Sequence, residues 1–306
     1  MAQTPGHGKR SLGIEVSSSV LNSVCLDEGG TIAKTFRRNF NASAGTVEQM
    51  DAFIAEIRGE FSGIESIGVA VPGLISRDTR RVAFSAHIPE HSEVDLAKGV
   101  HEVSGLPTII ENDANAAAYG EFRLGAGRES RNIFYATLGS GVGGAFIFDG
   151  EIWSGKSGFA GEFGYVAINS EGMRLEDVAS SANIVRRTRS RMLQDSTSSL
   201  SSLEGEIGIT DIVAAAGTED DLAQMMLSRT GEYVGTAIAS VINLLNIETI
   251  VIGGELMEAG HHVLDAVVSR ARELSFGPSF ASTRIVSGTL GRNAAAAGAA
   301  LIAAEN

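Results

Sequence analysis

Two widely separated segments of this chain repeat one pattern: an apolar strand, a turn of small residues, a second apolar strand, and then an acidic residue and glycine. The first begins at Gly13 and reads GIEVSSSVLNSVCLDEGG, and the second begins at Tyr135 and reads YATLGSGVGGAFIFDGE. Small residues let backbone N–H groups point inward with no side chain in the way, as in loops that hold phosphate. One such hairpin is typical of an ordinary glycine-rich turn. Two of them, one in each half of the chain, indicate a duplicated nucleotide clamp whose halves face each other across a cleft.

Strands and helices alternate along the rest of the chain. The range 46–61 places its apolar residues on one helical face, and 64–71 is a buried type of strand that stops at Pro72 and Gly73. Further strands are expected at 107–110, 132–138, 143–150, 247–254 and 283–286, and further helices at 94–103, 175–193, 220–246, 261–274 and the alanine-rich end. The helix over 220–246 is expected to break or bend near Gly231 and Gly235. This alternation predicts an α/β fold with mixed or parallel sheets.

The length of the chain predicts its division into domains. A chain of 306 residues suits two compact lobes better than one. We expect an N-terminal α/β lobe over 1–118, joined by the C-terminal helix 291–306, and a C-terminal α/β lobe over 119–290.

The composition argues against several classes of protein. A formal net charge of −13 disfavours nucleic acid as a partner, because a phosphate backbone binds a basic face. Cys25 is the only cysteine, which excludes a disulfide within the chain and a four-cysteine metal site. The first ten residues are polar and no apolar run is long enough to span a bilayer. We therefore expect a cytoplasmic protein with no membrane partner.

Two histidines have a spacing that suggests metal ligands. His87 and His91 lie four positions apart, but Pro89 breaks the helix that such a pair would need. We expect two exposed loop histidines instead.

The stretch ENDANAAAYGEF, residues 111–122, joins a short buried strand to an alanine-rich helix. Asn and Asp accept hydrogen bonds from the free N–H groups of a helix start, so Asp113 is readily interpreted as a helix cap. An acid where a strand leads into a helix also lies where open α/β sheets place ligand chemistry. From these residues alone, Asp113 is either a cap or a catalytic base.

The order of motifs resembles that of the ROK family of sugar kinases, open reading frames and repressors, within the actin-like ATPase superfamily. The resemblance runs from about Leu12 to Ala303 and rests on VAVPGLIS, ENDANAAAYGE, TLGSGVGGAFIFDG, AGEFGY, INLLNIETIVIGG and the alanine-rich end. It implies a two-lobed α/β actin-like (ribonuclease H-like) fold with a central cleft that binds ATP, Mg2+ and a hexose. It also implies that Asp113 is the base that accepts the proton of the sugar hydroxyl.

Further contacts are implied by the same resemblance. Sugar contacts fall on Gly73, Asn112, Glu162, Tyr165 and Glu176. Nucleotide and magnesium contacts fall on Glu15, Ser17, Ser18, Ser19, Gly139, Ser140, Gly141, Gly143, Gly253 and Gly254. Several have a plainer interpretation: Gly253 and Gly254 as a strand-end turn, Glu162 as a surface acid, and Glu176 as a charge in the first turn of a helix.

Three departures from the family pattern matter. Tyr165 takes the place of the zinc-binding histidine and NSEGMRLED replaces the cysteine cluster, so no structural zinc is expected. His87 takes a position where family kinases often place an asparagine near the sugar. The first phosphate loop is Asp-x-Gly-Gly-Thr in family kinases and EVSSS here. Ser17 and Ser18 add Cβ atoms where backbone approaches phosphate, and they disfavour positive φ.

Two classes of function remain. The first is an ATP-dependent kinase that phosphorylates a hexose or N-acetylhexosamine, with no direct protein ligand assigned to the metal. The second is a non-catalytic, sugar-binding regulatory protein that kept the cleft and lost phosphoryl transfer. Family repressors carry a helix-turn-helix domain before this part, and few residues precede the first strand here, so direct DNA binding is not expected. We expect a small-molecule sugar as the partner and a homodimer as the assembly.

Overall fold

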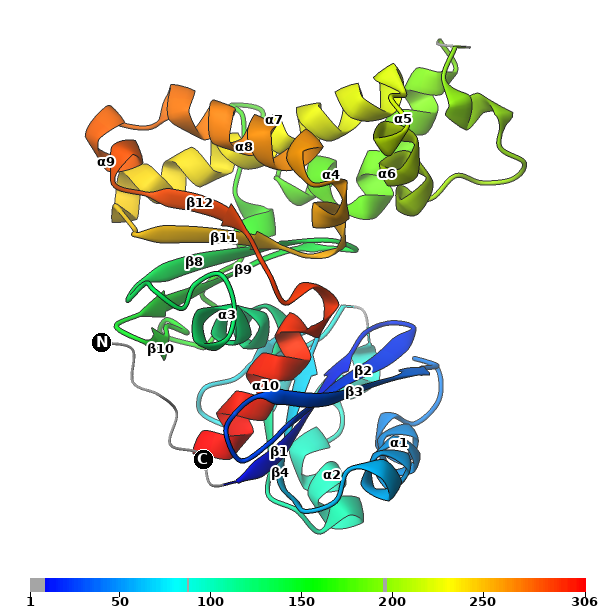
Figure 1. Ribbon diagram of the computed structural model, residues 1–306, viewed down its shortest axis with the longest axis vertical. Helices are drawn as coiled ribbons and strands as arrows, with labels where there is room; N and C mark the ends of the chain where they lie inside the picture. Colours follow the sequence, from blue (N-terminus) through cyan, green and yellow to red (C-terminus); the bar gives the residue numbers. More distant parts are fainter. Residues whose placement is uncertain (1–8, 87, 195–196) are drawn as a thin grey trace. The chain divides into compact units, whose positions relative to one another are not determined.

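The computed structural model describes residues 9–86, 88–194 and 197–306 (Figure 1). The contacts divide the chain into two compact units. The first unit comprises Met1–Glu129, Ala145–Ala160 and Leu290–Asn306, and the second comprises Ser130–Gly144 and Gly161–Thr289.

A five-stranded sheet forms the centre of the first unit. Its strand order is β3 (Ile32–Asn39), β2 (Val20–Leu26), β1 (Arg10–Val16), β4 (Ile64–Val71) and β7 (Thr108–Asn112). β2 is antiparallel to β1 and β3, whereas β4 is parallel to β1 and β7. The carboxyl ends of β1, β4 and β7 therefore meet at one end of the sheet. Glu15, the turn at Pro72 and Gly73, and Asp113 lie at this end.

The second sheet repeats the design of the first. Its strand order is β10 (Glu151–Ile152), β9 (Val142–Phe148), β8 (Ile133–Leu138), β11 (Thr249–Gly253) and β12 (Arg284–Ser287). β11 is parallel to β8 and β12, and β10 is antiparallel to β9. Both predicted hairpins are present, at equivalent positions of the two sheets, as the repeated sequence pattern indicated.

Helices cover both faces of the first sheet (Figure 1). α1 (Thr46–Glu60) and α2 (Leu96–Ser104) lie on one face, and α10 (Ala294–Glu305) and α3 (Asp113–Arg123) lie on the other. The predicted apolar stripe of α1 is buried in the core beside the sheet, which confirms the helix read from its spacing. The unit also contains the short strands β5 (Leu74–Ile75) and β6 (Val82–Phe84), and the 3-10 helices η1 (Pro89–Ser92) and η5 (Gly291–Asn293).

The helices of the second unit include the longest in the described chain. They are α4 (Glu176–Ala179), α5 (Ser181–Met192), α6 (Ile209–Gly217), α7 (Asp221–Leu245), α8 (His261–Leu274) and α9 (Gly277–Ala281), with the 3-10 helices η2 (Phe163–Tyr165), η3 (Ser199–Ser202) and η4 (Glu255–Ala259). Within the three described ranges, no helix combines the length and the apolarity needed to cross a membrane.

The alanine-rich helix α10 packs unusually close to its neighbours. A Cβ atom added at Gly13 would lie 1.8 Å from the Ala296 carbonyl oxygen, and one added at Gly298 would lie 1.7 Å from the Ala116 carbonyl oxygen. No side chain fits at such distances, so glycine is required where β1 and α3 meet α10. Small residues on all sides of α10 thus allow the chain terminus to fill the space between α3 and the sheet.

The sequence predicts a break or a bend near Gly231 and Gly235 in the long helix of the second unit, and the break is wrong. α7 is continuous through Gly231 and Gly235. Added Cβ atoms would lie 2.5 Å from the Val263 carbonyl oxygen and 2.7 Å from the Val267 carbonyl oxygen, both in α8. The two glycines therefore permit close packing of α8 against α7, which a local preference for breaking a helix does not reveal.

Candidate functional site

Asp113 is the first residue of α3 and directly follows the last residue of β7. The N-cap of this helix is Asn112, whose side-chain oxygen accepts a hydrogen bond from the Asn115 N–H at 3.0 Å. Asp113 Oδ1 accepts hydrogen bonds from the Ala114 N–H at 2.9 Å and from the Asn112 side-chain amide at 3.1 Å. The helix cap is therefore Asn112 rather than Asp113.

Asn112 also links this helix start to the turn after β4. Its side-chain N–H donates to the Gly73 carbonyl oxygen at 3.0 Å. Glu111, which the sequence did not single out, supports the same segment: its Oε1 accepts from the Asn112 N–H at 2.8 Å and from the Asn115 amide at 3.0 Å. Burial raises the pKa of Glu111. The structure thus brings Gly73, Asn112 and Asp113 together.

Glu15 lies one residue before the end of β1, in the same unit as Asp113. Burial, and then the negative charge of Asp113, raise the pKa of Glu15 from 4.5 to about 7, while a hydrogen bond from Asn22 opposes the shift. Two carboxyl groups that influence each other in this way compete for ionisation. This end of the first sheet is therefore an acidic site that a proton or a cation would stabilise.

The first serine-rich loop is held by hydrogen bonds between its own residues. Neither Ser17 nor Ser18 is among the residues with positive φ, which agrees with the expectation that serine disfavours it, and the crowding of phosphate by their Cβ atoms stays a prediction. The Ser17 N–H donates to the Val20 carbonyl oxygen at 2.9 Å, and the Val20 N–H donates to Ser17 Oγ at 3.1 Å. The loop closes on itself through the Ser17 hydroxyl. Ser18 and Ser19 are exposed at its tip.

The second loop, after β8, is held by hydrogen bonds within the second unit. The Gly139 N–H donates to the Gly141 carbonyl oxygen at 3.0 Å, and the Ser181 N–H donates to the Gly139 carbonyl oxygen at 2.8 Å. Ser140 is exposed at the turn. Gly143, expected in the loop, is the second residue of β9, because the strand already begins at Val142.

Glu162 and Glu176 form a second pair of neighbouring acids. Glu176 Oε2 accepts a hydrogen bond from the Val142 N–H at 3.0 Å, so this side chain supports the start of β9. Burial, and then the charge of Glu176, raise the pKa of Glu162. Tyr165 is 64% exposed, and the guanidinium of Arg174 lies 4.8 Å from its ring centre.

Gly253 and Gly254 end β11 in a tightly packed turn. A Cβ added at Gly253 would lie 2.3 Å from the Tyr135 hydroxyl, and one at Gly254 would lie 2.3 Å from the Leu138 carbonyl oxygen. Gly254 also has a φ of 93°. Packing alone therefore explains both glycines, and their predicted role in binding adenosine stays a prediction.

Glu255 is an acid near the second loop that the sequence gave no reason to select. Its Oε1 accepts a hydrogen bond from the Ser181 hydroxyl at 2.6 Å. A Cβ built on Gly139 would lie 3.8 Å from the same oxygen. A carboxylate directly after the IVIGG strand is the only signal in the sequence, and an isolated acid there is usually a surface residue.

The expectation of two exposed loop histidines is wrong for His91. Its side chain is fully buried, and its Nε2 lies 3.2 Å from Thr46 Oγ1. Burial lowers its pKa from 6.5 to about 4. His87 lies outside the described residues. Across the described ranges, no three His, Cys, Asp or Glu side chains are grouped so that they could hold a metal ion.

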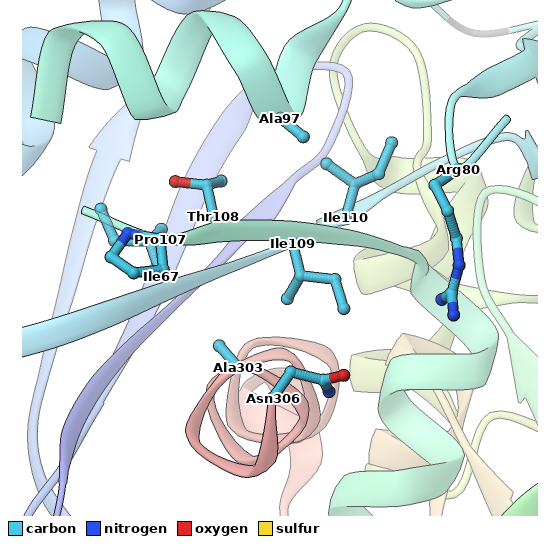
Figure 2. A pocket seen from close by; sticks show the side chains of 9 residues that line it. All are labelled: Ile67, Arg80, Ala97, Pro107, Thr108, Ile109, Ile110, Ala303 and Asn306. Carbon is cyan, nitrogen blue, oxygen red and sulfur yellow. The ribbon is translucent and has the colours of Figure 1, made fainter. Parts of the chain in front are cut away.

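A pocket of about 320 Å³ lies beside the edge strand β7 in the first unit (Figure 2). Ile109 points toward Ala303 and Asn306, whereas Ile110 lies on the side of Ala97 and Arg80. None of the predicted site residues lines this pocket. Its position does not support it as the sugar site.

Each of the two α/β units has a mixed sheet, and the two sheets have the same strand order. Acids or glycine turns lie at the ends of the strands. These shared features define a class of protein. The ROK family glucokinase from Streptomyces griseus, in complex with glucose and AMPPNP, matches this structure with a TM-score of 0.88 and 26% identity, over 97% of this chain and 100% of that one. The predicted α/β actin-like ATPase fold of two domains is thereby confirmed.

The family follows from the sequence comparison. The model of the ROK family matches residues 11–306, so the chain belongs to the ROK family, as its motifs predicted. A glucokinase of Halalkalibacterium halodurans is 31% identical over 275 residues, which are 84% of this chain and 83% of that protein. A xylose repressor of Bacillus subtilis (strain 168) is 26% identical over 302 residues, 97% of this chain and 77% of that protein. The relatives thus include both kinases and regulators.

Proposed function

We propose that this protein is an ATP-dependent sugar kinase that phosphorylates a hydroxyl group of a hexose or N-acetylhexosamine. The observation that carries the proposal is the position of Asp113 at the end of β7, with the capping task of its helix performed by Asn112. A carboxylate that is not the helix cap is suited to orient a hydroxyl group and accept its proton. General base catalysis of this kind contributes a rate factor of about 10²–10⁴.

The proposed sugar contacts follow from chemistry that each unit supplies. In the first unit, Asn112 and the Gly73 turn lie next to Asp113. In the second unit, Glu162 and Glu176 offer acceptors to sugar hydroxyl groups, which both donate and accept. Tyr165, which follows Glu162 closely in the sequence, adds an exposed aromatic ring. In each unit, these groups are proposed contacts for sugar hydroxyl groups, and positioning accounts for most of the catalysis of phosphoryl transfer.

The acidic end of the first sheet fits a magnesium ion bound with ATP. The raised pKa of Glu15 beside Asp113 indicates a place where positive charge is favourable. Mg2+ is commonly held by one or two carboxylates together with waters and substrate phosphates, so few protein ligands are needed. Glu15 would hold the ion through a bound water, and the ion would neutralise charge on the transferred phosphoryl group. Ser17, Ser18 and Ser19 in one unit, and Gly139, Ser140, Gly141 and Gly143 in the other, would contact the phosphates, and Gly253 and Gly254 the adenosine.

Two observations favour the alternative, a sugar-binding regulator without phosphoryl transfer. The Ser17 N–H is already used inside its loop, so it offers phosphate one donor fewer. The carboxylate of Glu255 lies beside Gly139, where its negative charge opposes that of a phosphate group. The similarity to a xylose repressor agrees with this alternative.

A panel of sugars separates the two functions. Each hexose and N-acetylhexosamine is tested for ATP-dependent formation of a sugar phosphate and, in parallel, for a shift in thermal unfolding. Turnover of one sugar supports the kinase. A rise in the melting temperature with a sugar, without turnover of any, supports the regulator, because a ligand that binds the native state alone stabilises it.

A further inference from the structure

Ser85 joins two segments next to the helix start of Asp113. It follows β6 directly and is only 4% exposed. Its hydroxyl donates to the Pro72 carbonyl oxygen at 2.5 Å and accepts from the Ile88 N–H at 3.2 Å. One buried hydroxyl therefore ties the segment after β6 to the turn that ends β4.

The same turn is held from its other side by Asn112. The Gly73 carbonyl oxygen accepts from the Asn112 side-chain amide, whose nitrogen also donates to Asp113 Oδ1. The turn packs directly on the segment of Ser85, because a Cβ added at Gly73 would lie 2.7 Å from the Phe84 carbonyl oxygen and 3.2 Å from Ser85 Cβ. The hydrogen bonds of Ser85 and Asn112, joined through the backbone of Pro72 and Gly73, thus connect Ser85 to Asp113.

We propose that Ser85 is a positioning residue for the Asp113 carboxylate. The inference rests on the proposed kinase function in assigning Asp113 as the base. Removing the hydroxyl leaves the Pro72 carbonyl oxygen and the Ile88 N–H without this partner. A buried polar group without a hydrogen bond costs free energy, so the segment shifts toward another partner. The turn then shifts, the Asn112 amide follows the Gly73 carbonyl, and Asp113 loses a donor that fixes its orientation.

A purely structural role for Ser85 has different consequences. A buried serine that only stabilises the loop would lower the melting temperature when replaced, without altering Asp113 or the balance of kcat and KM. Ser92 provides a matched control, since its hydroxyl, at an exposed position of η1, donates to the Pro89 carbonyl oxygen at 2.7 Å. Both serines donate to a proline carbonyl, but only Ser85 is connected to Asp113.

The test compares Ser85→Ala, Ser85→Thr and Ser92→Ala in the full chain. Amide hydrogen exchange is followed at Ala114 and Asn115, whose N–H groups bond to Asp113 Oδ1 and Asn112 Oδ1.

In Ser85→Ala we expect both amides to exchange several-fold faster and kcat to fall by about tenfold to a hundredfold, since small misplacement of reacting groups has effects of this size. KM for ATP should stay within twofold, because no phosphate or adenosine contact is proposed at Pro72, Gly73 or Ser85. Ser85→Thr, which keeps the hydroxyl, should restore both properties, and Ser92→Ala should match the wild type.

The outcomes separate this inference from the proposed function. The inference would be overturned if Ala114 and Asn115 exchanged at the same rates in Ser85→Ala as in the wild type. It would also be overturned if they exchanged faster in this variant while kcat stayed unchanged. Equal effects in Ser92→Ala would also overturn it. Absence of turnover by the wild type with every sugar would defeat the proposed function, while the exchange rates would still decide whether Ser85 positions Asp113. If Ser85→Ala does not fold, Ser85→Cys replaces it, because a thiol keeps the shape and donates only weakly.

Discussion

Asn112 and Asp113 divide two tasks that a single acidic residue at a helix start often combines. Asn112 caps α3 and holds the Gly73 turn, whereas Asp113 Oδ1 accepts from the Ala114 N–H and from the Asn112 side-chain amide. Ser17 shows the opposite case, in which one hydroxyl serves its own loop. Replacing neighbouring polar residues of similar type is therefore expected to have different effects on stability and on activity.

Ser17→Ala should lower the free energy of unfolding by about 1 kcal/mol, because the Val20 N–H loses an acceptor in a half-buried turn. Ser18→Ala, at the exposed tip of the same loop, should stay within about 0.5 kcal/mol of the wild type. Urea unfolding of the three proteins measures the difference. Equal stabilities for both variants would show that the Ser17 hydroxyl does not hold the loop.

At the scale of whole elements, glycine determines which helices and strands can approach closely. Gly13 and Gly298 permit contact with α10 and α3, and Gly231 and Gly235 permit contact between α7 and α8. In each case the backbone of one element lies where a side chain of the other would be. The glycines are therefore packing residues, although glycine lowers helix propensity.

Gly235→Ala should destabilise the protein by about 1–3 kcal/mol, although alanine favours the helix, because its Cβ would lie 2.7 Å from the Val267 carbonyl oxygen. Gly217→Ala is the control in the same unit: it ends α6, and nothing lies within 4 Å of its added Cβ. That change should leave stability unchanged or raise it by up to about 1 kcal/mol. Thermal unfolding would contradict this account if Gly235→Ala were as stable as Gly217→Ala.

The sequence predicts features that depend on local periodicity and misses those that depend on a distant partner. The apolar stripe of α1, the two hairpins and the alternation of strands with helices are all local patterns, and the structure contains them. The continuity of α7 depends on α8, and the burial of His91 depends on contact with Thr46, so neither could be read from nearby residues. Glu255 is missed for the same reason.

The candidate site shows the same division. The motif around Asp113 identifies the segment, and the parallel strands bring it to the Gly73 turn and to Glu15. The assignment of the cap to Asn112, however, requires the hydrogen bond to Asn115 to be seen. Ser85 carries no pattern in the sequence at all, because its partners lie three and thirteen positions away.

For the whole molecule, two buried groups give stability opposite dependences on pH. The pKa of Glu15 is raised to about 7, so the folded state holds a proton that the unfolded chain has released, and stability falls as pH rises from 4.5 through 7. The pKa of His91 is lowered to about 4, so its contribution is present above pH 6.5 and is lost as pH falls toward 4. The two effects oppose each other between about pH 4.5 and 6.5.

Glu15→Gln isolates one of these effects. The neutral amide removes the ionisation, so the variant should gain about 1–3 kcal/mol of stability relative to the wild type at pH 8 compared with pH 5. Glu65→Gln, at an exposed position of β4, controls for the effect of the Glu-to-Gln change itself. Urea unfolding at both pH values provides the measurement, and a Glu15→Gln gain that is equal at pH 5 and pH 8 would contradict the raised pKa.

The substitution Asp113→Asn tests whether Asp113 is the base of a sugar kinase. The amide keeps the size and hydrogen-bonding capacity of the side chain but cannot accept the proton. With the sugar that the wild type phosphorylates, kcat of the variant should fall by about 10²–10⁴, while calorimetry should find the sugar dissociation constant within a few-fold of the wild-type value. A variant with wild-type kcat would contradict the assignment of Asp113 as the base.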